Sequence, residues 1–79
     1  MRLKRAIAIK LKKICNERNI TPNKLASICF LTQSTVQNLI TEKYNNPKLL
    51  TIIRICEGLN IQVKEFFDDD IFNNIERED

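Results

Sequence analysis

The 79-residue sequence contains only one glycine and two prolines. Folds built from many short strands need these residues at their tight turns, so their scarcity argues against a β-sandwich or a β-barrel. Apolar residues make up 43% of the chain and charged residues 29%, a balance typical of globular rather than disordered proteins. The length allows one small domain, and we expect that domain to be helical.

Apolar residues recur at helical spacing along the first half of the chain. Thr21 followed by Pro22 predicts the start of a second helix, over about residues 22–29, because threonine caps a helix and proline fits its first turn. Thr32 is the next candidate cap and precedes a third helix over about residues 33–40. The apolar face of the first helix consists of Leu3, Ile7, Leu11, Ile14 and Cys15.

The second half of the chain predicts two further helices. An Asn-Asn-Pro sequence at 45–47 interrupts the chain, since a residue before proline avoids the helical region. A fourth helix and a short fifth element over residues 63–67 follow, so we predict a compact, all-α, five-helix domain over residues 1–67. Residues 68–79 then form a short acidic C-terminal extension. The fourth helix has the clearest apolar stripe, formed by Leu49, Ile52, Ile55, Cys56 and Leu59.

Charge is unevenly distributed along the chain. Residues 1–24 hold eight lysines and arginines against one glutamate, whereas residues 65–79 hold seven acids against one arginine. The basic front half suggests a polyanionic partner, and the acidic end suggests a surface that stays away from that partner. A solvated basic helix and a solubilising tail explain the same pattern, so charge alone leaves both interpretations open.

The sequence also lacks the features of several protein classes. It has no histidine, and so short a chain has little volume for a deep pocket, so we expect no enzyme, no catalytic residue and no cofactor. Cys15, Cys29 and Cys56 are odd in number and far apart, which predicts reduced core thiols in the cytoplasm rather than disulfides or a metal site. Apolar runs reach only four residues, so neither a membrane span nor a secretory signal is expected.

The short link between the second and third predicted helices carries the main functional signal. Residues 30–32 are too few for the two helices to pack side by side, so the helices must cross steeply, with Ala26 and Val36 meeting at the crossing. The exposed face of the third helix then carries uncharged groups that donate and accept hydrogen bonds, as the base edges in a DNA major groove require. A helix face that is polar by chance is the alternative. The side chains concerned are Gln33, Ser34, Gln37 and Asn38, with Thr32 and Thr35 at the edge.

These features resemble the phage-repressor and Cro-like (XRE-type) helix-turn-helix family. The resemblance extends from about Lys10 to Phe67 and includes the stretches NERNITPNKLA (16–26), LTQSTVQNL (31–39) and TIIRICEGLNI (51–61). Each stretch alone is weak, but together and in this order they are specific for the fold. The resemblance implies a lambda-repressor-like domain whose third helix enters the major groove of double-stranded DNA.

The resemblance also implies which residues contact DNA. Base reading is assigned to Gln33, Ser34 and Asn38, with Gln37 contacting a base or a phosphate. Phosphate contacts are assigned to Thr21, Asn23, Thr32, Thr35, Lys43 and Asn45, of which the last two lie in the loop after the third helix.

The sequence departs from the family pattern at several positions. Phe30 and Glu42 stand where many members have glycine, so either the turn at Phe30 relaxes or packing holds this residue in a left-handed conformation. The charge of Glu42 also lies near the expected phosphate path. Pro22 replaces a common phosphate-binding glutamine, and Cys15 with Ile40 replaces a buried ion pair that several members have.

Apolar residues away from the main stripes predict a homodimer. One small core does not cover all of them, and an exposed apolar patch favours self-association. The sequence therefore predicts a small, sequence-specific transcriptional regulator, a repressor, that binds double-stranded DNA. The alternative is a protein-interaction module, such as an antitoxin-like or adaptor protein with a protein partner and weak DNA binding. The residues assigned to the dimer interface are Leu50, Ile53, Phe67, Ile71 and Phe72.

Overall fold

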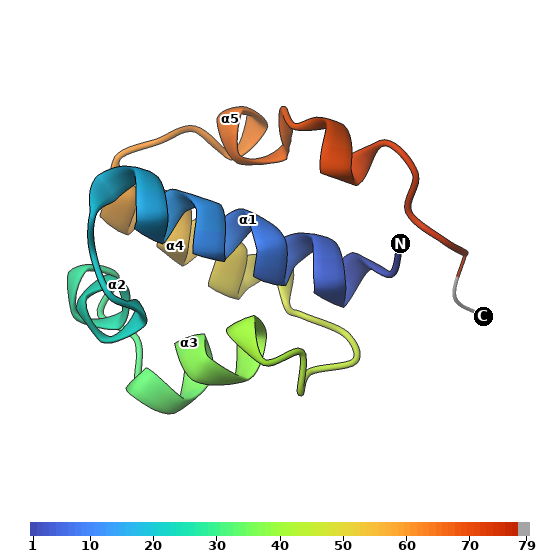
Figure 1. Ribbon diagram of the computed structural model, residues 1–79. Helices are drawn as coiled ribbons and strands as arrows, with labels where there is room; N and C mark the ends of the chain where they lie inside the picture. The colour runs from blue at the N-terminus through green and yellow to red at the C-terminus, as the bar shows by residue number, and fades with distance from the viewer. Residues whose placement is uncertain (78–79) are drawn as a thin grey trace.

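The computed structural model describes residues 1–77, which form five α-helices and one turn of 3-10 helix (Figure 1). The elements are α1 (Leu3–Arg18), α2 (Pro22–Ile28), α3 (Gln33–Ile40), α4 (Leu49–Leu59), α5 (Val63–Phe67) and η1 (Asp70–Phe72). No strand occurs within residues 1–77, so the prediction of an all-α fold is confirmed. None of the helices in this range combines the length and the apolar character needed to cross a membrane. Glu78 and Asp79, the end of the predicted acidic extension, lie outside the described residues.

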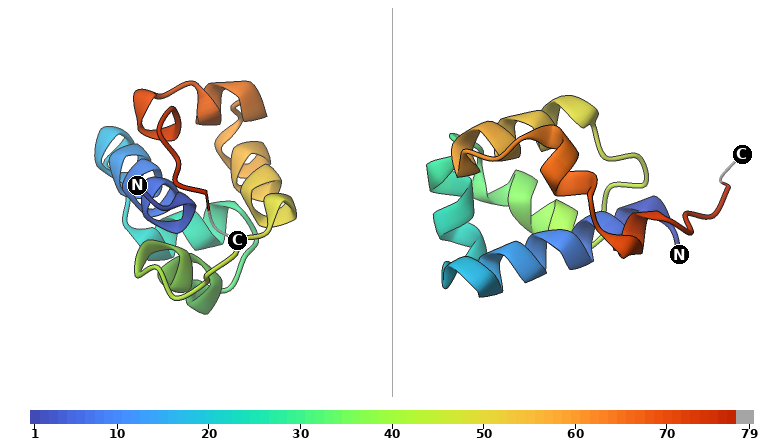
Figure 2. Two further views of the ribbon diagram at one scale, coloured as in Figure 1. Left: turned by 90° about the vertical axis from the view of Figure 1, so that its right-hand side faces the viewer. Right: turned by 90° about the horizontal axis from the view of Figure 1, so that it is seen from above.

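α1 and α4 lie on opposite sides of the core, and the other elements close the space between them (Figures 1 and 2). α2 and α3 close one side of this space, and α5 with η1 closes the other, as the end-on view in Figure 2 shows. α5 and η1 therefore lie on the face of the molecule opposite α3.

Two threonines begin the helices of the first half as the sequence predicts. Thr21 Oγ1 accepts a hydrogen bond from the backbone N–H of Lys24 at 3.1 Å. Thr32 Oγ1 accepts one from the backbone N–H of Thr35, also at 3.1 Å. Each bond satisfies one of the N–H groups that the first turn of a helix leaves without a partner. Both predicted caps are confirmed.

The core consists of the apolar stripes of α1 to α4 together with Phe66 of α5. The three cysteines are free and buried, and burial raises the pKa of each thiol above its ordinary value. The prediction that they are core residues is confirmed. Helical spacing predicts Leu49 in the buried stripe of α4, but this prediction is wrong: Leu49 is 59% exposed, because it is the first residue of the helix and the core begins one turn later, at Ile52.

The C-terminal segment is tied to α1 by Asp69. The Asp69 carboxylate accepts hydrogen bonds from the Nζ atoms of Lys10 at 3.1 Å and Lys13 at 3.0 Å, and from the N–H of Ile71 at 3.2 Å. These donors, Lys13 foremost, hold the pKa of Asp69 well below its usual range. The Asp69 side chain is only 10% exposed, so this member of the acidic run is not simply a solvated charge.

Three aromatic rings pack together beside this ion-pair cluster. The ring centroids of Phe66 and Phe67 are 5.0 Å apart, and those of Phe67 and Phe72 are 4.9 Å apart. Phe67 and Phe72 thus pack against the chain's own core. Of the other residues assigned to a dimer interface, Leu50 is exposed, and Ile53 and Ile71 are half-buried.

The turn between α2 and α3 is neither relaxed nor held by packing of Phe30, the two alternatives that the sequence suggests. Phe30 has a φ of 54°, so it is left-handed and the turn has not relaxed. Its side chain is 94% exposed, so packing does not hold it there either. Instead, the N–H of Leu31 donates to the carbonyl oxygen of Ala26 at 2.9 Å, as at a left-handed helix end. The expectation of a relaxed turn or a packed Phe30 is therefore wrong.

Candidate nucleic-acid interface

α2, the turn at Phe30 and α3 form a helix-turn-helix on one side of the molecule (Figure 1). Ala26 of α2 is 1% exposed and Val36 of α3 is 0% exposed, and both belong to the same core cluster. Leu39, at 2% exposure, completes the inward face of α3. Because Val36 and Leu39 point inward, the opposite face of α3 is turned to the solvent.

The exposed face of α3 forms the wall of a shallow surface hollow of about 360 Å³. The hollow brings together all four residues predicted to read bases and two of those predicted to contact phosphates. Its lining offers side-chain amides and a hydroxyl, with one positive charge. The lining residues are Gln33, Ser34, Gln37 and Asn38 of α3, Asn23 of α2, and Lys43 of the loop after α3.

The four remaining predicted phosphate contacts already take part in hydrogen bonds within the protein. Thr21 and Thr32 cap α2 and α3, and the hydroxyl oxygens of Thr32 and Thr35 are 2.8 Å apart. The Oδ1 atom of Asn45 accepts a hydrogen bond from Lys4 Nζ at 3.1 Å. None of these four residues lines the hollow, and Thr35 is half-buried.

Glu42 follows α3 in a left-handed conformation, with a φ of 62°. Its carboxylate lies 3.6 Å from Nη1 of Arg5 on α1. The pair partly neutralises the negative charge that the sequence places near the phosphate path. α1 therefore contributes to the electrostatics of this face, a role that helical periodicity does not indicate.

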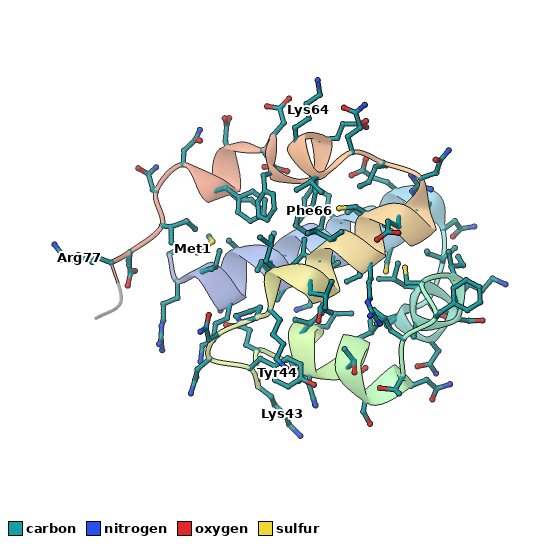
Figure 3. All side chains as sticks on the ribbon, turned by 180° about the vertical axis from the view of Figure 1, so that it is seen from behind. Met1, Lys43, Tyr44, Lys64, Phe66 and Arg77 are labelled. Atoms are coloured by element: carbon teal, nitrogen blue, oxygen red, sulfur yellow. The ribbon has the colours of Figure 1, made fainter. Side chains whose placement is uncertain are left out.

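Tyr44 also belongs to this face, although no pattern in the sequence predicts a role for it. Its hydroxyl oxygen accepts a hydrogen bond from Nδ2 of Asn38 at 3.3 Å. Tyr44 and Lys43 project from the loop after α3, away from Lys64 on α5 (Figure 3). The only signal in the sequence is an aromatic residue in a polar loop, because a contact between a helix and a loop follows no periodic pattern.

Comparison with protein families decides the identity of the domain. A family model described as the Cro/C1-type HTH DNA-binding domain matches residues 10–70. The chain belongs to the Cro/C1-type helix-turn-helix family. No curated protein and no solved structure matches it. The resemblance inferred from the motifs is therefore confirmed.

Membership of the Cro/C1-type family makes the protein a DNA-binding transcription regulator in general terms. The Cro/C1-type match covers α2 and α3 in full and ends at Asp70, the first residue of η1. It thus includes the hollow on α3 and the Asp69 cluster that ties the C-terminal segment to α1.

Proposed function

We propose that the protein is a small repressor that recognises a specific double-stranded DNA sequence by inserting α3 into the major groove. The observation that carries this proposal is the hollow on α3, where four uncharged hydrogen-bonding side chains lie beside one lysine. Amide side chains pair with base edges, whereas a lysine binds the phosphate backbone without regard to sequence. An ordinary solvated helix face would carry glutamate and lysine in alternation instead.

The distribution of charge supports the same orientation. α5 and η1 lie on the face opposite α3, with Asp69 capping η1, and Arg5 partly neutralises Glu42 beside the hollow. In the proposed complex the acidic residues Asp69 and Asp70 at η1 point away from the DNA. The proposed base-reading residues are Gln33, Ser34, Gln37 and Asn38, which line the hollow with Asn23 and Lys43. The proposed phosphate contacts come from Asn23 and Lys43, together with Thr21, Thr32, Thr35 and Asn45.

We also propose that the active form is a homodimer in the cytoplasm. A twofold dimer would set two copies of α3 about 34 Å apart, which is one turn of B-DNA. Leu50, 59% exposed on α4, is the strongest remaining candidate for the contact between copies. Sedimentation equilibrium at tens of micromolar, without and with DNA, tests this part, and a monomer in both states contradicts it.

Selection of bound sites from a random pool of double-stranded DNA tests the proposed function. We expect an enriched motif with two half-sites, and an affinity for that motif that falls steeply with salt because bound phosphates release counterions. Competition with random DNA serves as the control for sequence preference. Binding without enrichment of any sequence contradicts the proposal.

A second candidate function is favoured by the exposed apolar side chains outside the hollow. Phe30 is 94% exposed, and Leu49 and Leu50 are each 59% exposed. Such a surface suits a protein partner, as in an antitoxin-like or adaptor protein. An apolar protein interface depends little on salt, so the salt titration separates this function from DNA binding.

A further inference from the structure

The hydrogen bond between Asn38 and Tyr44 joins a helix to a loop within the proposed reading surface. Asn38 is a half-buried residue of α3, and Tyr44 lies two residues beyond the left-handed Glu42. The Nδ2 atom of Asn38 donates to the Tyr44 hydroxyl at 3.3 Å. No helix cap or core contact needs this bond, because Asn38 lies in the interior of α3 and points out of the core.

Hydrogen bonds of its two neighbours tie the loop around Tyr44 to α3 and α1. Before Tyr44, the N–H of Lys43 donates to the carbonyl oxygen of Asn38 at 2.9 Å, which closes the end of α3. After it, Asn45 is bound to Lys4 of α1 at 3.1 Å. Tyr44 itself also lines a hollow of about 220 Å³ between α3 and the start of α4. The residues on both sides of Tyr44 are therefore bound to α3 and α1, which places the tyrosine hydroxyl beside Asn38.

The bond to Tyr44 limits which bases Asn38 can recognise, because it uses one of the hydrogen-bond donors of the Asn38 amide. An asparagine amide has two N–H donors and one oxygen acceptor. When one donor is given to Tyr44, one donor and one acceptor remain for DNA. Adenine presents one acceptor, N7, and one donor, the N6 amino group, whereas guanine presents two acceptors, N7 and O6. The remaining groups match adenine and cannot satisfy both acceptors of guanine.

We propose that Tyr44 is a positioning residue that makes Asn38 select adenine over guanine. This inference rests on the proposed function, since it requires that α3 read bases in the major groove. Tyr44 acts through Asn38, and its own O–H hydrogen remains free to donate. Loss of the Tyr44 hydroxyl releases the second donor of Asn38, which can then reach guanine.

The variant Tyr44→Phe tests the inference, because it removes only the hydroxyl. Asn38→Ala first identifies the base pair that Asn38 reads, as the position where sequence preference relaxes. Dissociation constants are then measured on the selected site with adenine or guanine at that position. We expect the preference for adenine over guanine to fall roughly tenfold in Tyr44→Phe. A change of this size is no larger than the preference that a single two-bond contact to a base provides. Affinity for random DNA should stay the same.

Two controls separate positioning from a merely structural role. Lys43 is the adjacent residue in the same loop. Lys43→Gln should weaken binding to all sequences alike and leave unchanged the ratio of the dissociation constants for the adenine and guanine sites. In the free protein, the side-chain amide resonances of Asn38 should shift in Tyr44→Phe while the melting temperature does not. The double variant Asn38→Ala with Tyr44→Phe should be no less selective than Asn38→Ala alone, since Tyr44 acts only through Asn38.

If the wild-type protein selects a site but Tyr44→Phe keeps the full preference for adenine, the role of Tyr44 is contradicted while the proposed function stands. The role of Tyr44 is also contradicted if the double variant loses selectivity beyond Asn38→Ala. A wild-type protein that selects no sequence overturns the proposed function and this inference together. Site selection shows that outcome before any variant is made, so the two failures are distinguishable.

Discussion

Gly58 of α4 lies so close to Cys29 that a β-carbon on Gly58 would stand 2.6 Å from the Sγ atom and 2.8 Å from the Cα atom of Cys29. The Sγ atom of Cys29 in turn lies 3.6 Å from the carbonyl oxygen of Ile55, to which the thiol donates a hydrogen bond. The chain's single glycine therefore permits the close approach of α2 to α4. It sits inside a helix, where glycine costs about 0.5–1 kcal/mol relative to alanine. This contact helps to set the position of α2, and with it the helix-turn-helix.

We predict that Gly58→Ala lowers the free energy of unfolding by about 1–3 kcal/mol, because the overpacking outweighs the better helix propensity of alanine. Thermal and urea unfolding measure the change. Glu57→Ala, at the exposed neighbouring position, is the matched control and should alter stability by less than about 0.5 kcal/mol. A variant as stable as the wild type would show that α2 and α4 can separate at little cost.

Local sequence signals predicted the helices because the forces that start and stop them act over a few residues. Thr21 and Thr32 form caps with N–H groups three positions ahead, and Val36 follows from helical spacing. The same signals placed four side chains of α3 on one exposed face, where the structure finds the hollow.

Contacts between distant residues could not be predicted in this way. Asp69 and Lys10 are 59 positions apart, and nothing in either segment indicates the other. The packing of Phe67 and Phe72 against the chain's own core is a second example, since no pattern in the sequence indicates it. The bond between Tyr44 and Asn38 is equally hidden in the sequence, since it depends on the path of a loop.

Phe30→Gly should raise the free energy of unfolding by about 1 kcal/mol, because glycine adopts positive φ without the strain that a β-carbon causes. The aromatic ring is 94% exposed, so its removal should sacrifice no packing. Phe30→Ala is the matched control, since it removes the ring but keeps the strained β-carbon, and its stability should stay close to that of the wild type. A loss of stability in both variants would mean that the ring packs in solution.

Asp69→Asn should lower the melting temperature at pH 7, because asparagine can still accept a hydrogen bond but carries no charge for Lys10 and Lys13. The folded pKa of Asp69 lies below its unfolded value, so the stabilisation is complete at neutral pH and is lost as the pH falls below about 5. The difference between wild type and variant should therefore shrink between pH 7 and pH 3. Asp68→Asn makes the same charge change at an exposed position and should have little effect. A difference that does not depend on pH would contradict the role of the charge.

The proposed DNA-facing surface can be tested by removing one positive charge from each of two opposite faces. Lys43 lies in the hollow on α3, and Lys64 lies on α5 at the other side of the molecule (Figure 3). Each phosphate that a protein neutralises adds about 0.9 to the slope of log affinity against log salt. Lys43→Gln should therefore reduce the magnitude of this slope by about 0.9, on the selected site and on random DNA alike, while Lys64→Gln leaves it unchanged. Binding measured by fluorescence anisotropy at four salt concentrations distinguishes the two variants. Equal slopes in Lys43→Gln and Lys64→Gln would show that Lys43 does not neutralise a phosphate. The hollow would then not be the place where the protein contacts the DNA backbone.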